Sequence, residues 1–139
     1  MIGIQLITST IHSLKLDHYP LDESDTETRD DKTFDLSYKP YFVEDEARTF
    51  ANIFTLKLIH PGEFNLEIEY ISWFSTGEDI TDTFKKSPFI KINVPAIAFP
   101  YLRSTISILT LTAGFPSAVL PTINFVQYSE RMENKENDR

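Results

Sequence analysis

Three histidines and two closely spaced glutamates are the residues of this chain with the clearest capacity for catalysis or metal binding. His12 and His18 lie in a β-branched, aliphatic segment, and His60 stands immediately before a Pro-Gly pair. Their spacing matches no pattern by which histidines hold a metal ion. Glu67 and Glu69 share one face of an alternating segment, as catalytic carboxylates can, but alternating acids are also the usual solvent side of a strand.

Other groups that support catalysis are scarce. The sequence has no cysteine, which excludes disulfides and thiolate metal sites, and its four glycines form no phosphate-binding loop. We therefore predict a protein that is not an enzyme and that uses neither a metal nor a cofactor.

The first half of the chain contains the strands that would position these side chains. Residues 2–16 are rich in β-branched and aliphatic side chains, and their alternation breaks near residues 8–11, which predicts a bulge. Residues 34–42 alternate cleanly except at Pro40. Because proline cannot donate a backbone hydrogen bond, we expect this second strand to lie at a sheet edge or to contain a bulge.

Two further strands are expected at residues 53–60 and 64–74. The Pro-Gly pair at positions 61 and 62 suits a type II turn, so these strands form a hairpin. In the last strand Ile71 and Trp73 fall on the otherwise polar face. One face of the sheet should therefore hold the core, while the other carries an apolar patch at one end.

A long apolar helix is predicted over residues 100–113. Pro100 suits the first helical position and keeps Phe99 extended, and Gly114 suits the end of the helix. Apolar side chains cover more of its circumference than one sheet contact requires, so we expect it to pack against its own sheet and against a partner subunit. A core helix in a monomer is the alternative. The residues assigned to the subunit interface are Tyr101, Leu102, Ile106, Ile108 and Leu109.

A shorter helix capped by Asn124 follows, and residues 133–139 form a polar tail. The elements together predict an α+β fold, in which a four-stranded antiparallel sheet of Greek-key-like order precedes one long and one short C-terminal helix. The length of 139 residues fits a single domain, residues 1–132, followed by the tail.

The chain is acidic, with a formal charge of −8, which argues against nucleic-acid binding. Seven acids against one arginine fall within residues 17–31, and they predict a solvated loop at about residues 18–32. The loop could dock a basic partner, but we favour a role in solubility. The sequence shows no basic leader and no stretch that approaches the roughly 20 apolar residues of a membrane span. We therefore expect a cytoplasmic protein without membrane insertion.

Two proline-framed motifs resemble the signatures of the SecB protein-export chaperones. The first is PAIAFPYLR at residues 95–103, and the second combines GFP at 114–116 with LPTINF at 120–125. Their order and separation also fit. The resemblance implies a homotetramer, built as a dimer of dimers that meet through the long helices. It further implies an ATP-independent holdase that binds extended apolar segments of unfolded client proteins in surface grooves.

The resemblance also implies contacts with SecA, the motor of protein export. The acidic positions that correspond are Asp17 and Glu67. The chain departs from the family pattern at Asn65, where the family has leucine, and at Ser13, where it has another acid. These departures leave binding to SecA open.

Exposed aromatic side chains at strand ends are the candidates for a client-binding groove, because they offer large contact areas at little cost in side-chain entropy. They are Tyr41, Phe42, Trp73 and Phe74. A core or subunit contact is the alternative for each. Three hypotheses result: a holdase that is general or devoted to export, a SecB-like chaperone dedicated to one client such as an antitoxin, and a non-chaperone adaptor or structural module on the same fold.

Overall fold

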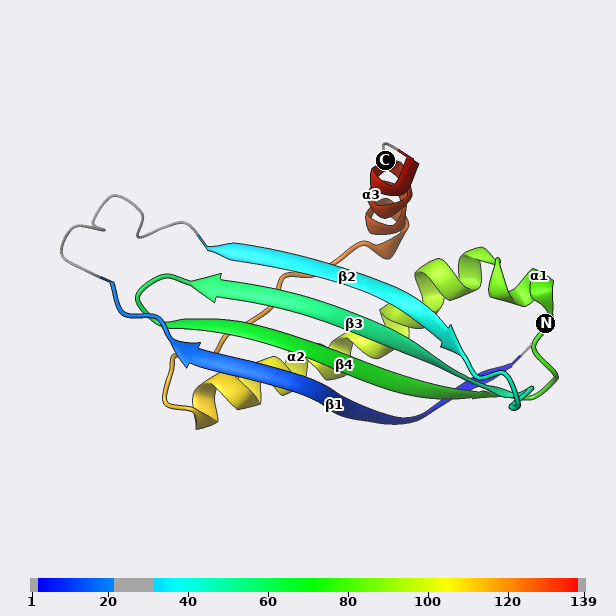
Figure 1. Ribbon diagram of the computed structural model, residues 1–139, viewed down its shortest axis with the longest axis horizontal. Helices are drawn as coiled ribbons and strands as arrows, with labels where there is room; N and C mark the ends of the chain where they lie inside the picture. Colours follow the sequence, from blue (N-terminus) through cyan, green and yellow to red (C-terminus); the bar gives the residue numbers. More distant parts are fainter. Residues whose placement is uncertain (1–2, 22–31, 138–139) are drawn as a thin grey trace.

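The computed structural model describes residues 3–21 and 32–137, which form an antiparallel sheet and helices that pack on one of its faces (Figure 1). The sheet order is β1-β4-β3-β2, which confirms the predicted Greek-key-like arrangement. Most of the expected acidic loop, residues 22–31, lies outside the described residues. The strands are β1 (Ile4–His18), β2 (Thr33–Phe42), β3 (Thr49–His60) and β4 (Phe64–Thr76). The helices are α1 (Asp82–Lys85), η2 (Phe89–Asn93), α2 (Val94–Thr112) and α3 (Phe125–Asn137).

The two edges of the sheet follow from local sequence signals. In β1 the register against β4 shifts between Leu6 and Thr8 and again between Ile11 and Ser13, which confirms the expected irregularity and adds a second one. β2 lies at the other edge, as Pro40 predicted. The β3–β4 hairpin turns at Gly62, whose φ of 86° suits the third position of a type II turn.

Alternation divides each strand between two faces of the sheet. The helix face, which α2 crosses diagonally in Figure 1, receives the even-numbered side chains of β2, β3 and β4. The opposite face, which we call the open face, carries no helix of the described residues. The most buried large side chains are Phe50, Phe54, Phe64, Phe74, Leu56, Leu66, Leu102 and Ile106. The core therefore lies between the helix face and α2.

The long helix begins earlier than the proline signal suggested. α2 starts at Val94 and continues from η2, with Pro95 in its first turn and Pro100 inside it, so Phe99 is helical rather than extended. The prediction was wrong because Pro95 already provides the preferred N-terminal proline. Proline at this position cannot donate to the carbonyl of Lys91, and the hydroxyl of Tyr38 donates to that carbonyl instead, at 2.8 Å.

The longer helix changes one expectation about membranes. By length and composition alone, Phe89–Thr112 is apolar enough to cross a membrane, with a mean hydropathy of 1.3 in its most apolar window. A helix that begins at Pro100, as predicted from the sequence, excludes residues 89–99 and is too short to span a membrane. A core helix passes the same test, and Val94, Ala98 and Leu102 of this helix are buried in the domain core. We therefore describe it as a core helix.

The end of α2 was predicted correctly. Gly114 has a φ of 98°, and its N–H donates to the carbonyl of Leu111 while the N–H of Phe115 donates to that of Thr110. This pair of bonds is the Schellman motif, which satisfies the last carbonyls of a helix.

The chain then returns across the sheet along α2. The Thr110 hydroxyl accepts the N–H of Ala118 at 2.9 Å, and the Ser107 hydroxyl donates to the Ala118 carbonyl at 2.8 Å. These bonds hold the returning segment on the flank of the helix and direct it toward the β2 edge.

The last helix starts where the sequence indicated and ends later. The Asn124 side-chain oxygen accepts the N–H groups of Val126 and Gln127, which confirms the predicted cap. α3 then runs to Asn137, so residues 133–137 of the expected tail are helical. The helix stands beside β2 at the edge of the sheet (Figure 1).

Candidate functional site

A groove runs between the outer edge of β2 and α3. Its largest section, about 780 Å³, lies between Phe34–Ser37 and the chain from Pro121 to Met132. A second section of about 290 Å³ shares Phe34 and Pro121 with the first, and a third of about 200 Å³ shares Met132. We call these three adjoining sections the β2 groove.

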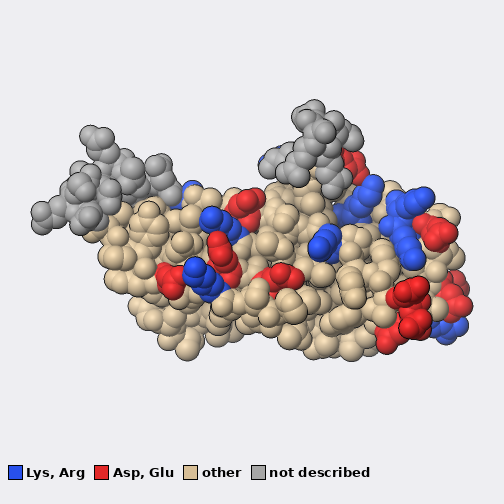
Figure 2. Space-filling view, viewed as in Figure 1, with Lys and Arg blue, Asp and Glu red and all other residues tan. Residues whose placement is uncertain are grey.

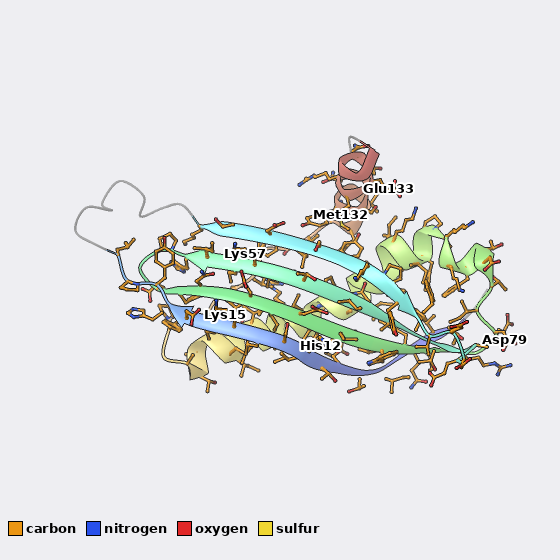
Figure 3. The ribbon with its side chains drawn as sticks, viewed as in Figure 1. His12, Lys15, Lys57, Asp79, Met132 and Glu133 are labelled. Carbon is orange, nitrogen blue, oxygen red and sulfur yellow. The ribbon has the colours of Figure 1, made fainter. Side chains whose placement is uncertain are left out.

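The floor of the β2 groove exposes a strand edge. Within the described residues no strand pairs with β2 on this side, so half of its backbone groups point outward. One of them, the carbonyl of Leu36, accepts the hydroxyl of Tyr128. Phe34, Ile123 and Met132 add apolar or thioether surface, and Figure 3 shows Met132 on α3 above the strand. The groove thus combines a strand edge that no described strand pairs, with the Leu36 carbonyl bonded to Tyr128, and apolar walls.

Polar contacts hold α3 over this edge. Besides the bond from Tyr128 to Leu36, the Lys91 ammonium lies 2.8 Å from a carboxylate oxygen of Glu133. Burial, together with the charges of Tyr128 and Glu133, raises the pKa of Tyr38 to about 12. Burial also raises the pKa of Tyr128. Both phenols are therefore neutral hydroxyl donors at neutral pH.

The raised pKa of Tyr38, whose hydroxyl donates to the carbonyl of Lys91, predicts that the fold loses stability in alkali. The pKa of Tyr38 is about 12 in the folded protein, against an ordinary value of 10.0, so the unfolded chain loses its proton first. The contribution to stability is complete below pH 10.0 and is lost as the pH rises from there toward 12. Urea unfolding across this range should show a smaller loss for Tyr38→Phe than for the unmodified protein. Equal losses would contradict the assignment.

The structure divides the four aromatic residues expected to line a groove. Tyr41 and Trp73 lie on the open face, where their rings meet edge to face at 6.2 Å over Ala51. Phe42 and Phe74 lie on the helix face. In each pair of consecutive residues, Tyr41–Phe42 and Trp73–Phe74, the two side chains therefore point to opposite faces of the sheet.

Phe74 must be removed from the candidate groove. Its side chain is fully buried and stacks on Phe50 with the ring centres 5.3 Å apart. Phe42 is half-buried against the same ring at 5.8 Å, and the Lys85 ammonium lies 5.3 Å from the Phe42 ring centre. Of the four candidates, Tyr41 and Trp73 are the two that lie in contact on the open face.

The histidines do not form a site. His18 and His60 flank Phe64 in one row across three strands. His18 packs against Phe115 at 6.1 Å, and His60 packs against Phe64 at 5.7 Å. Among the described side chains, in residues 3–21 and 32–134, no group of three or more histidine or acidic side chains is placed to hold a metal ion.

Comparison with known proteins gives the family. The model of the preprotein translocase subunit SecB matches residues 49–135, which include β3, β4 and the helices. The chain belongs to the SecB family. The protein-export protein SecB of Ehrlichia chaffeensis is 28% identical to it over 130 residues, which cover 91% of this chain and 71% of that protein. SecB of Ehrlichia canis is 28% identical over 120 residues, covering 86% and 66%.

Solved structures support the SecB fold. A SecB-like chaperone of Mycobacterium tuberculosis, in complex with a ChAD peptide from the HigA1 antitoxin, superposes with a TM-score of 0.64. It is 15% identical, and the match covers 86% of this chain and 89% of that one. A protein of unknown function from Streptococcus agalactiae matches with a TM-score of 0.52 at 12% identity. At these identities the likeness shows the fold, which confirms the predicted architecture.

The two acids predicted to contact SecA, Asp17 and Glu67, lie on adjacent strands of the open face. Asp17 pairs across strands with Asn65, and Glu67 pairs with Lys15 and Lys57. The Lys15 ammonium lies 3.9 Å from Asp17 and the Lys57 ammonium 3.8 Å from Glu67; both lysines are labelled in Figure 3. Each acid therefore has a basic neighbour, which lowers the net negative charge of this SecB surface.

The interface residues predicted on the long SecB helix belong to two sides of it. Leu102 and Ile106 are fully buried in the domain, and Leu109 is partly buried against the same core. Tyr101 and Ile108 are 52% and 64% exposed. The exposed side forms a stripe with helical spacing, which we call the α2 stripe: Ile97, Tyr101, Ile108 and Leu111.

Proposed function

We propose that this SecB-family protein is an ATP-independent chaperone that binds extended apolar segments of unfolded proteins along β2. The observation that carries the proposal is the outer backbone edge of β2, which pairs with no described strand and is bonded by α3 at Leu36, along the β2 groove. An extended segment can add to such an edge by main-chain hydrogen bonds, which any sequence can supply. The apolar walls then favour the side chains that unfolded proteins expose.

Because the side chains of a bound client strand would alternate between two sides, the proposed client site also includes part of the open face. A client strand beside β2 would direct alternate side chains into the β2 groove and toward the open face. At the end of β2 the open face carries Tyr41 and Trp73, which retain the predicted role of client contact. One segment would thus use both surfaces without any change in the sheet.

A second candidate is a SecB-like chaperone dedicated to a single client. The basic neighbours of Asp17 and Glu67 favour it, because they reduce the acidic character of the surface expected to bind SecA. The M. tuberculosis SecB-like structure contains an antitoxin peptide, which offers a precedent for such a client. Co-purification with one partner and no retention on SecA would favour this version over an export chaperone.

We also propose that the subunits assemble through the α2 stripe into a dimer of dimers in the cytoplasm. A row of exposed Ile, Tyr and Leu side chains on one helix is a surface that subunit contact would remove from water. The adaptor hypothesis would share this assembly but not client binding.

A charge placed in the β2 groove is expected to abolish chaperone activity. Met132 is half-buried on the groove side of α3, and Met132→Asp would put a carboxylate among the apolar walls. We expect the unmodified protein to prevent aggregation of a denatured client without nucleotide, and the variant to lose most of this protection.

Val126→Asp is the matched control, because Val126 lies on α3 outside the β2 groove and is exposed. It should protect as well as the unmodified protein. Failure of the unmodified protein to protect at several-fold excess would contradict the holdase proposal. Equal protection by Met132→Asp and the unmodified protein would show that clients do not bind in the β2 groove.

A further inference from the structure

Tyr128 reaches the outer backbone edge of β2 from α3. Its hydroxyl donates to the carbonyl of Leu36, and both residues line the largest section of the β2 groove. The Tyr128 ring stacks on the Tyr38 ring with the centres 6.2 Å apart and meets the Phe125 ring edge to face at 6.4 Å. These two ring contacts hold the hydroxyl at the strand edge.

The bonded carbonyl lies at the centre of a short run of outward backbone groups. The N–H and C=O of one residue in an antiparallel strand point to the same side, and those of the next residue point to the other side. The groups that share the outer edge with Leu36 therefore belong to Phe34, Tyr38 and Pro40. Because Pro40 has no N–H, the complete pairs of groups are those of Phe34, Leu36 and Tyr38. An added strand would be centred on Leu36.

Side-chain charge does not fix the register of such a strand. On the open face, the exposed Asp35 and Lys39 place one charge of each sign along this part of β2. Figure 2 shows acidic and basic side chains intermixed over the sheet. Register must then come from the backbone groups of the edge, and the Leu36 carbonyl is the one that already has a donor.

We infer that the Tyr128 hydroxyl competes with client proteins for the Leu36 carbonyl, so that a client strand binds in register by taking over this acceptor. The inference rests on the proposed function, because it concerns the same strand edge. When a client binds, a client N–H replaces the hydroxyl at the Leu36 carbonyl, and the released hydroxyl donates to water or to a client carbonyl. The exchange costs the protein one hydrogen bond that it has in the free state.

Tyr128→Phe removes the competing donor and keeps the ring. The probe is a labelled peptide of non-repeating Leu, Val, Phe and Ser residues, followed by fluorescence anisotropy. We expect the variant to bind it about five-fold more tightly, as the loss of one net hydrogen bond from the free state predicts. The variant should also unfold at a lower urea concentration. Damage to the groove would instead weaken stability and binding together.

Glu133→Gln is the matched control for a general loosening of α3. It removes the ion pair between the Glu133 carboxylate and the Lys91 ammonium, which lie 2.8 Å apart, and leaves the Leu36 carbonyl bonded. We expect no gain in peptide affinity. A gain equal to that of Tyr128→Phe would assign the effect to the attachment of the helix and overturn the competition for one carbonyl.

Methylated peptides identify the client group that takes the carbonyl. In a series of the same peptide, one backbone N–H at a time is replaced by N-methyl. At one position, methylation should abolish the gain from Tyr128→Phe, because the freed carbonyl then has no client donor; the gain should persist at the other positions. Persistence of the gain for every methylated peptide would contradict the inference.

The results distinguish the competition from the proposed function. If the unmodified protein binds the peptide and Tyr128→Phe binds it equally well or more weakly, the competition is refuted and the chaperone proposal stands. If the unmodified protein binds no peptide and protects no denatured client, the proposed function fails and the competition fails with it.

Discussion

Replacing Phe74 by alanine is expected to lower the free energy of unfolding by about 3–5 kcal/mol, as for other fully buried phenylalanines. The ring is fully buried and stacks on Phe50, so truncation leaves a cavity between the sheet and the helices. Urea unfolding followed by circular dichroism would measure the change. A loss below about 1 kcal/mol, typical of surface positions, would place the ring outside the core.

Trp73→Ala provides the matched control, because it truncates the next aromatic residue on the same strand. Trp73 is only half-buried and lies on the open face against Tyr41. We expect it to cost about 1 kcal/mol in stability and to weaken client binding. Reduced stability without any change in client binding would remove the open-face aromatics from the proposed site.

Ile108→Asp is expected to break the proposed tetramer while leaving the subunit folded. The side chain is 64% exposed and lies in the middle of the α2 stripe, so the charge would be desolvated only in an assembly. Light scattering should show the mass falling to that of a smaller species at micromolar concentration. Circular dichroism and the unfolding midpoint should change little.

Ala96→Asp places the same charge on an exposed position of α2 that is outside the α2 stripe, and it should leave the mass unchanged. A monomeric unmodified protein, or an identical mass for Ile108→Asp and the unmodified protein, would contradict assembly through this helix. The two variants together distinguish a specific surface from a general effect of charge on the helix.

The strands were predictable because alternation and turn residues are local signals. Pro40 marked the edge, Pro61 and Gly62 the hairpin, and Gly114 the end of α2. The start of α2 was not predictable by the same logic, because two prolines compete for the N-terminal position. Packing of Val94, Ala98 and Phe99 in the core keeps the helix continuous through Pro100 and outweighs its lost hydrogen bond.

The candidate site was predicted less well than the fold. Trp73 and Phe74 cannot line one groove together, because consecutive strand residues point to opposite faces of the sheet. The β2 groove was missed because its two walls, β2 and α3, are distant in sequence and meet only after the chain returns across the sheet. The signals available were the edge strand marked by Pro40 and the apolar side of a helix capped by Asn124.

The hydrogen bonds that fasten the returning chain to α2 would connect the proposed assembly through the α2 stripe to the proposed client site in the β2 groove. Ser107, beside Ile108, holds Ala118, which lies shortly before the groove residue Pro121. A client that displaces this segment would therefore strain or break its hydrogen bonds to α2, the helix that carries the α2 stripe. Thermodynamic reciprocity then requires that assembly change client affinity by the same factor by which client changes assembly. We expect client affinity to vary with the concentration of the protein itself.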